Sequence, residues 1–445
     1  MKPALCLDFG TSAIRAVFRS GTGARDVLNI GDVTDSRSID GASIRSEISI
    51  DADEETIRFG ERAYEAHLAG TKPLFREASP KLWFAQPRDL VLPVVPGLTI
   101  TRRDLIAGLL AYAMYAADKT GRWRIPKRLD GVDLRIAHPV WPRETRQRAE
   151  EALAQIGWLA LHMAGEGDWG ETSADVLLSW TSPDAGMPPR LVSSVDTLEP
   201  VAAAVELLPG TTNSRRICVV VDVGAGTTDL GVFQALSPDA ASKKASKLIP
   251  AGPTVSVFKA GDEIDRTVVR LLKEKYPDDY PRNKADIETR IRSLKENLFK
   301  QGQLRVGGMG LDLKTLEGAP EMRAMASEVR ARLELCLATA HSSIEAWSST
   351  QSGVTERSIA LVMAGGGAQL DFLRKGLSRP LQLNGRTYEF QLVEPQAPPS
   401  LLMHGAGYTR LAVALGGANP TYDTVIHEHT EISRIASLGR PKQVI

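Results

Sequence analysis

The sequence predicts an α/β protein built from two related lobes. Strand-like apolar runs alternate with helical patterns along the 445 residues, which is typical of α/β folds. The run VVVDVGAGTTDLGVF (219–233) also repeats the pattern of LCLDFGTSAIRAVF (5–18). The two copies lie 214 positions apart, counted from Asp8 to Asp222. Such an internal repeat predicts two half-domains that face each other.

Both copies contain the same chemical groups in the same order. An apolar strand ends in an aspartate, a glycine follows two positions later, hydroxyl side chains come next, and a second apolar strand closes the copy. These residues are Asp8, Gly10, Thr11 and Ser12 in the first copy, and Asp222, Gly224, Gly226, Thr227 and Thr228 in the second. Glycine lets backbone N–H groups approach an anion, and hydroxyls donate to phosphoryl oxygens. The matched pair therefore predicts phosphate binding, against the alternative of two ordinary β-hairpins with Asp/Gly turns.

The two strand-end aspartates predict a metal ion. A carboxylate beside a polyphosphate is repelled unless a cation lies between them. Asp8 and Asp222 are therefore predicted to hold Mg²⁺, through its water shell because Mg²⁺ loses water reluctantly. The sequence contains no G-x-x-x-x-G-K-[ST] segment, which excludes a P-loop NTPase.

A third glycine motif lies in IALVMAGGGAQL (359–370). It predicts a buried strand that ends in Gly365, Gly366 and Gly367, followed by a helix that starts at DFLRKGL. A junction of this kind presents backbone N–H groups to a ligand. After two phosphate-binding loops, the third motif is predicted to contact adenosine.

These three segments resemble the phosphate 1, phosphate 2 and adenosine motifs of the actin/Hsp70/sugar-kinase ATPase superfamily, and within it the Hsp70 nucleotide-binding domain. Four more segments are similar to parts of that domain: DTLEPVAAAVELL (196–208), IAHPVWPRETRQRAEEALAQIGW (136–158), FKAGDEIDRTVV (258–269) and FGERA (59–63). The resemblance covers about residues 1 to 415. It implies an actin-like ATPase fold, in which two lobes of duplicated ribonuclease H-like domains enclose a nucleotide cleft. It also implies ATP or ADP and Mg²⁺ as cofactors.

The resemblance assigns roles to further residues. Glu199 matches the group that positions or activates the attacking water, and Asp229 either assists it or fixes the second loop. Lys81 matches a lysine that reaches the γ-phosphate and the water, with Lys72 as a nearby alternative. The four hydroxyls are expected to meet the β- and γ-phosphates, although one of them is expected only to pack.

The adenine side of the resemblance falls on one helix, predicted at 285–301. Lys295 aligns with the family's adenine-contacting lysine. The family's glutamate one turn earlier falls on Arg292, so the sequence departs from the family there. The other interpretation of this helix is a solvated amphipathic face.

The predicted organisation has three parts. Residues 1–208 form the first lobe, with a small subdomain at about 35–115. Residues 209–417 form the second lobe, with a helical insertion at about 262–355. Residues 418–445 form a C-terminal tail that is too short for a peptide-binding domain, and that serves as an edge strand with a tail or as a docking segment.

Composition narrows the expected partners and location. Lys+Arg and Asp+Glu are both 54, so the formal net charge is zero, and this balance favours neither nucleic acid nor an anionic membrane as a partner. The three scattered cysteines predict reduced thiols. No signal peptide and no apolar stretch of 18 residues is recognised, so we expect a cytoplasmic protein.

The function expected from these features is a Mg²⁺-dependent, slowly hydrolysing ATPase of the Hsp70-like kind. Because no peptide-binding domain is recognised, the chain would act as a nucleotide-dependent switch on a separately encoded protein partner. One alternative is an actin-like filament-forming ATPase, which AGGGAQL (364–370) also resembles. A second is a small-molecule kinase of the same fold. The oligomeric state is not predicted.

Overall fold

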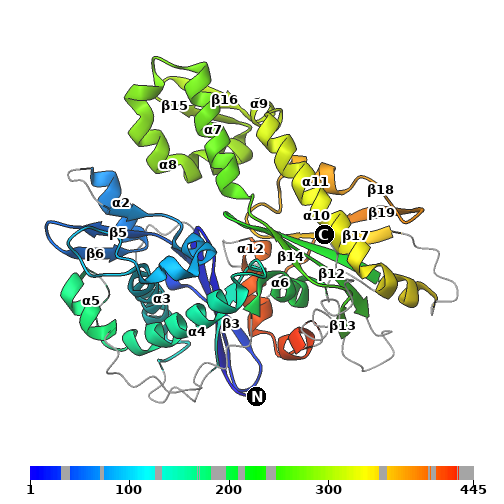
Figure 1. Ribbon diagram of the computed structural model, residues 1–445, viewed down its shortest axis with the longest axis horizontal. Coiled ribbons are helices and arrows are strands. Elements are labelled where there is room, and N and C mark those ends of the chain that lie inside the picture. The colour runs from blue at the N-terminus through cyan, green and yellow to red at the C-terminus, as the bar shows by residue number, and fades with distance from the viewer. Residues whose placement is uncertain are drawn as a thin grey trace, which may run out of the picture.

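The structure is a computed structural model with a mixed α/β architecture (Figure 1). It describes residues 1–31, 41–70, 75–125, 133–167, 169, 171–181, 197–208, 216–236, 247–349, 358–398, 401, 407–427 and 429. The predicted α/β class is thereby confirmed.

Two main sheets repeat one strand order. The first runs β10 (Thr197–Leu198), β8 (Asp133–His138), β1 (Ala4–Phe9), β2 (Ala13–Arg19) and β3 (Arg25–Leu28), and β4 (Ser43–Arg45) also pairs with β2. The second runs β19 (Arg386–Val393), β17 (Ser358–Ala364), β11 (Arg216–Val223), β12 (Thr228–Leu236) and β13 (Lys247–Pro250), with β18 (Leu381–Leu383) beside β19 and β14 (Val255–Val257) beside β12. In each sheet the first three strands of this order are parallel and the remaining pairings are antiparallel.

Register places the two repeated motifs at equivalent points of the two sheets. Asp8 lies opposite Ala137 on the parallel side, and Asp222 lies opposite Ala364. Each aspartate is the last residue but one of its strand. The carboxyl ends of the central strands are therefore occupied by the same chemistry in both lobes, as the sequence repeat predicts.

The helices α6 (Glu199–Leu207) and α12 (Tyr408–Ala418) lie between the two sheets (Figure 1). They pack very closely, because a Cβ atom on Gly416 would lie 1.8 Å from the carbonyl oxygen of Ala202. Their buried alanines and valines join the apolar faces of both sheets into one core cluster. This helix pair forms the junction of the lobes.

Further helices cover the outer faces of the sheets. On the first lobe, α3 (Arg102–Lys119) packs against α4 (Arg146–Met163). A capping box starts α3, since Thr101 accepts from the Asp104 N–H and the Asp104 carboxylate accepts from the Thr101 N–H. On the second lobe, α10 (Pro320–Ser349) packs against β12 and β14. This long helix lies within the range predicted for the helical insertion, about 262–355.

The small subdomain is a second layer beside the first sheet. Its four strands run β7 (Phe75–Glu77), β5 (Ile48–Asp51), β6 (Thr56–Phe59) and β9 (Thr172–Ser173), and its helices are α2 (Glu61–Ala69), α5 (Ala174–Thr181) and the 3₁₀ helices η1 (Pro80–Ala85) and η2 (Pro87–Val91). The strand β9 comes from far outside the predicted 35–115 range. Trp169, next to β9, is buried against Phe59 with ring centroids 6.0 Å apart.

The insertion of the second lobe rises above its sheet at the top of Figure 1. It contains α7 (Gly261–Lys275), α8 (Tyr280–Gln301), the hairpin of β15 (Gln303–Val306) and β16 (Met309–Asp312), and α9 (Leu313–Glu317). After β17 the chain forms α11 (Asp371–Leu377), which starts at the residue predicted from DFLRKGL.

The described part of the C-terminal segment is helical over 422–427. Tyr422 is fully buried, and the Leu198 N–H donates to its Oη at 2.8 Å. Asp423 forms an ion pair with the buried Arg135 at 2.8 Å, and His429 is buried beside Thr254. The prediction of an edge strand is therefore wrong for this segment, because its apolar side chains pack beneath the junction of the lobes. Residues 430–445 lie outside the described residues.

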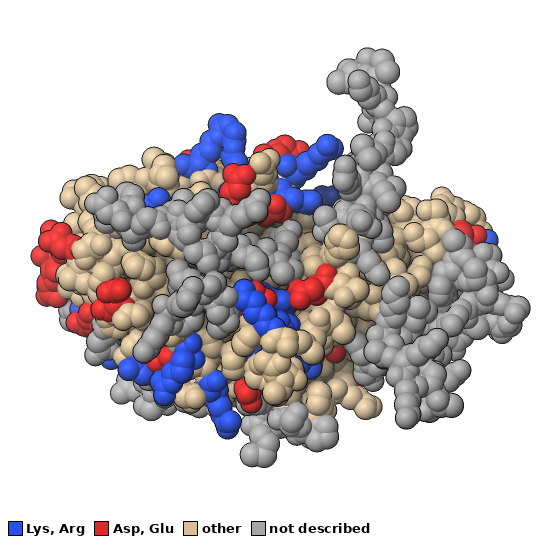
Figure 2. Space-filling view, turned by 90° about the horizontal axis from the view of Figure 1, so that it is seen from below, with Lys and Arg blue, Asp and Glu red and all other residues tan. Residues whose placement is uncertain are grey.

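The surface carries both charges interspersed, as the face in Figure 2 shows for the described residues. The three cysteines are free and buried. Within the described ranges, none of the helices combines the length and the apolar character needed to cross a membrane.

Candidate functional site

The two predicted loops close with the same turn. The Gly10 N–H donates to the Ala13 carbonyl at 3.1 Å, and the Gly224 N–H donates to the Thr227 carbonyl at 2.9 Å. A Cβ atom on Gly10 would lie 2.6 Å from the Ala13 oxygen, so a side chain would break this turn.

The structure brings the two loops into contact. A Cβ atom on Gly226 of the second loop would lie 2.8 Å from the Thr11 hydroxyl of the first. Gly226 is therefore small because the opposite loop occupies the space that a side chain would need. Two loops more than 200 residues apart in the sequence are therefore in contact where the lobes meet.

Four carboxylates and a lysine are buried around these loops. Asp8, Asp222, Asp229, Glu199 and Lys81 are each at most 7% exposed. The Lys81 ammonium donates to Glu199 Oε1. Lys81 comes from η1 and Glu199 is the first residue of α6, so the pair joins the small subdomain to the junction helix. The structure thus gathers all five of these predicted residues in one place.

Burial and mutual repulsion raise the carboxyl pKa values. Burial raises the pKa of Asp222, and Glu199, Asp229 and Asp8 raise it further. Burial also raises the pKa of Glu199, with Asp229 and Asp8 adding to the effect and Lys81 opposing it. Burial alone would lower the pKa of Lys81, but Glu199 outweighs it and the net shift is upward, so the lysine stays protonated.

Arg15 is a second cation in the cluster, and sequence reasoning missed it. Its Nη1 atom lies 3.5 Å from Asp8 Oδ2, and burial of Asp8 raises a pKa that Arg15 and Lys81 lower. The hairpin register places Arg15 directly opposite Asp8, so cross-strand pairing of the motif offered the signal that would have found it. With Arg15 and Lys81 charged, the four carboxylates leave a formal charge of −2 (four negative, two positive).

The charges of the cluster bear on whether it could hold a divalent cation. With all four carboxylates ionised, that formal charge is equal in size and opposite in sign to the charge of one Mg²⁺ ion. Across the part of the chain that the structure describes, no three His, Cys, Asp or Glu side chains converge closely enough to hold a metal directly. Among the described residues the structure therefore offers no direct site of three or more such ligands, and a hydrated Mg²⁺ ion held by Asp8 and Asp222 stays a prediction.

The four predicted hydroxyls have different environments. Thr11 and Thr227 are buried where the two loops meet, and Thr227 donates to Asp229. Ser12 is partly exposed in the first loop. The Thr228 hydroxyl donates to the Lys259 carbonyl at 2.8 Å, so Thr228 is the one that packs.

Asp229 is held by its neighbours. Its Oδ1 atom accepts from the Ser256 hydroxyl and from the Val140 N–H, the latter at 3.3 Å. Val140 follows β8 of the first lobe, and Ser256 lies on β14 of the second. Asp229 therefore ties the two lobes together below the loops, which supports the loop-fixing role of the two that were expected.

The glycine motif only partly matches its prediction. The Gly365 N–H donates to the Thr409 carbonyl at 3.0 Å and the Gly367 N–H donates to the Val223 carbonyl at 2.9 Å. These two groups are therefore not free for a ligand, because they anchor the turn to α12 and β11. Gly366 is exposed, and nothing lies within 4 Å of a Cβ atom placed on it.

Lys295 is held by residues of its own lobe. Its ammonium donates to the Gly261 carbonyl at 3.0 Å and pairs with Asp265 at 2.8 Å. Lys295 thus braces the start of α7 behind the second loop, and its contact with adenine stays a prediction. The alternative lysine, Lys72, lies outside the described residues.

Comparison with known proteins adds nothing to this geometry: no family model matches the chain, and no curated protein matches its sequence significantly.

Proposed function

We propose that this chain is a Mg²⁺-dependent ATPase of the actin/Hsp70/sugar-kinase superfamily, with an Hsp70-like nucleotide-binding fold. The observation that carries the proposal is the pair of equivalent glycine turns, which face each other above buried Asp8 and Asp222. A shared strand order in the two main sheets supports an actin-like duplicated fold. A chance pair of hairpins would have no reason to meet at one charged cluster.

Two sets of residues would bind the metal and the phosphates. Asp8 and Asp222 would hold hydrated Mg²⁺, which when bound neutralises the charge of the phosphates. Backbone N–H groups of the loops and the hydroxyls of Thr11, Ser12 and Thr227 would bind phosphoryl oxygens.

Lys81 and Glu199 would act on the hydrolysis itself. Glu199 would accept a proton from, or orient, a water molecule aligned with the terminal phosphate. Lys81 would stabilise charge on the equatorial oxygens, because it stays protonated beside several carboxylates. Turnover would be slow where lobe closure limits the rate.

The switch role follows from the position of the site between lobes. Nucleotide in the cleft would favour one angle between the lobes, and a separate protein partner would read that angle. The downstream activity would then be carried out by that separate protein.

Direct measurement of nucleotide binding tests the proposal. Isothermal titration of the purified chain with ATP or ADP should show binding that depends on Mg²⁺ in the wild type and not in Asp222→Asn. Steady-state ADP release should then show turnover without any acceptor added. Absence of Mg²⁺-dependent binding in the wild type would overturn the proposal.

The same sample separates the alternatives. Pelleting of the protein on addition of ATP would favour an actin-like filament, whereas unchanged sedimentation favours the switch. ADP release that depends on an added hydroxyl acceptor would favour a kinase.

A further inference from the structure

Helix α8 carries two cationic side chains one turn apart, Arg292 and Lys295. Lys295 contacts the second lobe, and Arg292 contacts the first. Lys295 donates to the Gly261 carbonyl at 3.0 Å. The Gly261 N–H in turn donates to the Gly224 carbonyl of the second loop at 3.2 Å. Through Gly261, Lys295 therefore helps to hold the loop that follows Asp222.

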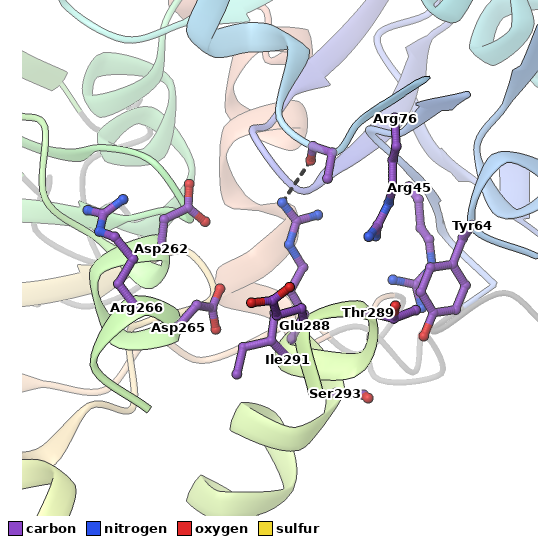
Figure 3. A pocket seen from close by; sticks show the side chains of 12 residues that line it. Arg45, Tyr64, Arg76, Asp262, Asp265, Arg266, Glu288, Thr289, Ile291 and Ser293 are labelled. Atoms are coloured by element: carbon purple, nitrogen blue, oxygen red, sulfur yellow. Dashed lines mark hydrogen bonds between the residues drawn. The ribbon is translucent and has the colours of Figure 1, made fainter. Parts of the chain in front are cut away.

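Arg292, three residues earlier on α8, reaches the opposite lobe. Its Nη2 atom donates to the Ala78 carbonyl at 2.7 Å and to the Ser79 hydroxyl at 3.0 Å. Figure 3 draws the residues around this contact, with Asp262 and Asp265 on one side and Arg45 and Arg76 on the other. Ser79 is the residue before η1, and Lys81 is the second residue of η1. The bond therefore ends two positions from the lysine that contacts Glu199.

Arg292 and Ala78 line a cavity of about 260 Å³ between the lobes. The first-lobe wall contributes Arg45 and Arg76, and the second-lobe wall contributes Asp262, Asp265 and Glu288 along with Arg266. Several of these charges are paired within their own lobe, Arg45 with Glu61, Arg76 with Glu47 and Asp265 with Lys295. The His67 Nε2 atom also lies 2.9 Å from the Thr289 hydroxyl across the same gap. Through these contacts the helical insertion of the second lobe touches the small subdomain of the first.

Arginine suits the crossing position. Both bonds come from one nitrogen, Nη2, whose two N–H donors serve a carbonyl and a hydroxyl at the same time. Arg292 Nη1 is buried without a hydrogen-bond partner among the described residues. Arg292 is thus held on one side only, and its position depends on how closely the lobes approach.

We propose that Arg292 is a positioning residue that sets Lys81 against Glu199 when the lobes are closed. Closure brings Arg292 to Ala78 and Ser79, which fixes the start of η1 and the lysine that η1 carries. Opening releases that start, and Lys81 loses its defined place. The catalytic part of this inference rests on the proposed ATPase function, whereas the structural part does not.

Two variants on α8 test it. Arg292→Ala removes the crossing bonds, and Arg290→Ala is the matched control, because Arg290 pairs only with Asp286 on its own helix among the described contacts, at 3.2 Å. Hydrogen exchange of the amides in 78–85, followed by mass spectrometry, reports the position of η1 without any nucleotide. Loss of hydrogen bonds to a charged group should speed exchange there by about 10-fold or more in Arg292→Ala, and leave Arg290→Ala like the wild type.

Turnover is the second readout. In Arg292→Ala we expect kcat for ATP hydrolysis to fall about 10-fold, with KM within about twofold of the wild type, because the lost interaction serves the transition state. Arg292→Lys, which keeps the charge without the fork, should recover only part of kcat.

The outcomes are separable. Unchanged exchange of 78–85 in Arg292→Ala overturns the positioning role, whatever the activity. Faster exchange with unchanged kcat overturns the link to Lys81. If the wild type binds no nucleotide, the proposed function fails, and faster exchange would still establish that Arg292 orders η1.

Discussion

Lys81 and Glu199 form a buried ion pair between segments 118 residues apart in the sequence, with side chains only 5% and 7% exposed. Lys81 arrives on η1 of the small subdomain, and Glu199 opens the junction helix α6. A buried pair of this kind is weak evidence for stability, because desolvation offsets the attraction. Its place beside three further carboxylates is better explained by chemistry at the site.

Replacing Glu199 tests that chemistry. Glu199→Gln keeps the size of the side chain and removes its ability to accept a proton, so ATP should still bind while hydrolysis slows by about 100-fold or more. Nucleotide titration and single-turnover ADP formation measure the two effects. Wild-type turnover in Glu199→Gln would remove this residue from the mechanism. Glu296→Gln, on the partly exposed side of α8, is the control.

Removing one carboxylate should stabilise the protein when Mg²⁺ and nucleotide are absent. The pKa of Asp222 is raised in the folded state, so its ionised form at neutral pH opposes folding. Asp222→Asn should therefore raise the free energy of unfolding by about 1 kcal/mol, measured by urea denaturation. The exposed Asp371→Asn serves as the control. With Mg²⁺ and ATP the order should reverse, because only the wild type gains stability from binding. A destabilised Asp222→Asn without ligand would contradict the electrostatic account.

Metal affinity should depend on pH in a defined direction. Burial, with Asp229 and Asp8, raises the pKa of Glu199 to about 7. Below that pH the protonated carboxyl adds no negative charge, so Mg²⁺ has less to neutralise. Affinity for MgATP should therefore rise from pH 6 to pH 8, by up to about tenfold per unit where one proton is displaced. Titration in buffers of different ionisation enthalpy would detect the released proton, and Glu199→Gln should flatten the dependence. An equal dissociation constant at pH 6 and pH 8 in the wild type would exclude this coupling.

Alanine substitutions at the adjacent glycines Gly365 and Gly366 should have very different effects on stability and nucleotide binding. Gly365 has φ of 77°, and a Cβ atom on it would lie 2.3 Å from Asp222 Oδ1. Gly365→Ala should cost about 1 kcal/mol or more through backbone strain alone, and it should also displace Asp222 and weaken Mg²⁺-dependent binding. Gly366→Ala meets open space and should leave stability and binding almost unchanged. Thermal unfolding and nucleotide titration of the two variants provide the comparison. Equal behaviour would show that the turn has another conformation in solution.

Tyr422 links the C-terminal segment to the helix that carries Glu199. Tyr422→Phe removes the hydroxyl that accepts from the Leu198 N–H. Loss of that acceptor should cost about 1–3 kcal/mol of stability, and it should lower kcat because the start of α6 shifts. Tyr388→Phe is the control, since its buried hydroxyl contacts His341 at 3.1 Å, away from the site. Urea denaturation and steady-state kinetics compare the pair. If kcat falls equally in both variants, the effect is general and not specific to α6.

The local features were predictable because they depend on short-range pattern. The apolar runs that end at Asp8 and Asp222 predict strands, and the glycine after each predicts the turn. The alanine-rich run after Leu198 predicts a helix that begins at Glu199.

Tertiary packing decided the rest. Arg292 reads as a departure from a family pattern, and only the approach of α8 to the small subdomain makes it a contact with Ala78. Lys295 is predicted to contact adenine, and only the structure shows that it donates to the Gly261 carbonyl at the start of α7 and pairs with Asp265. The C-terminal segment is predicted to be an edge strand with a tail or a docking segment, and only the structure shows Tyr422 buried at the junction of the lobes. The sequence by itself determined which groups stand at the strand ends, because strand period and turn chemistry act over a few residues. The partners of the long polar side chains were decided only by how the two lobes pack, because those distances join residues hundreds of positions apart.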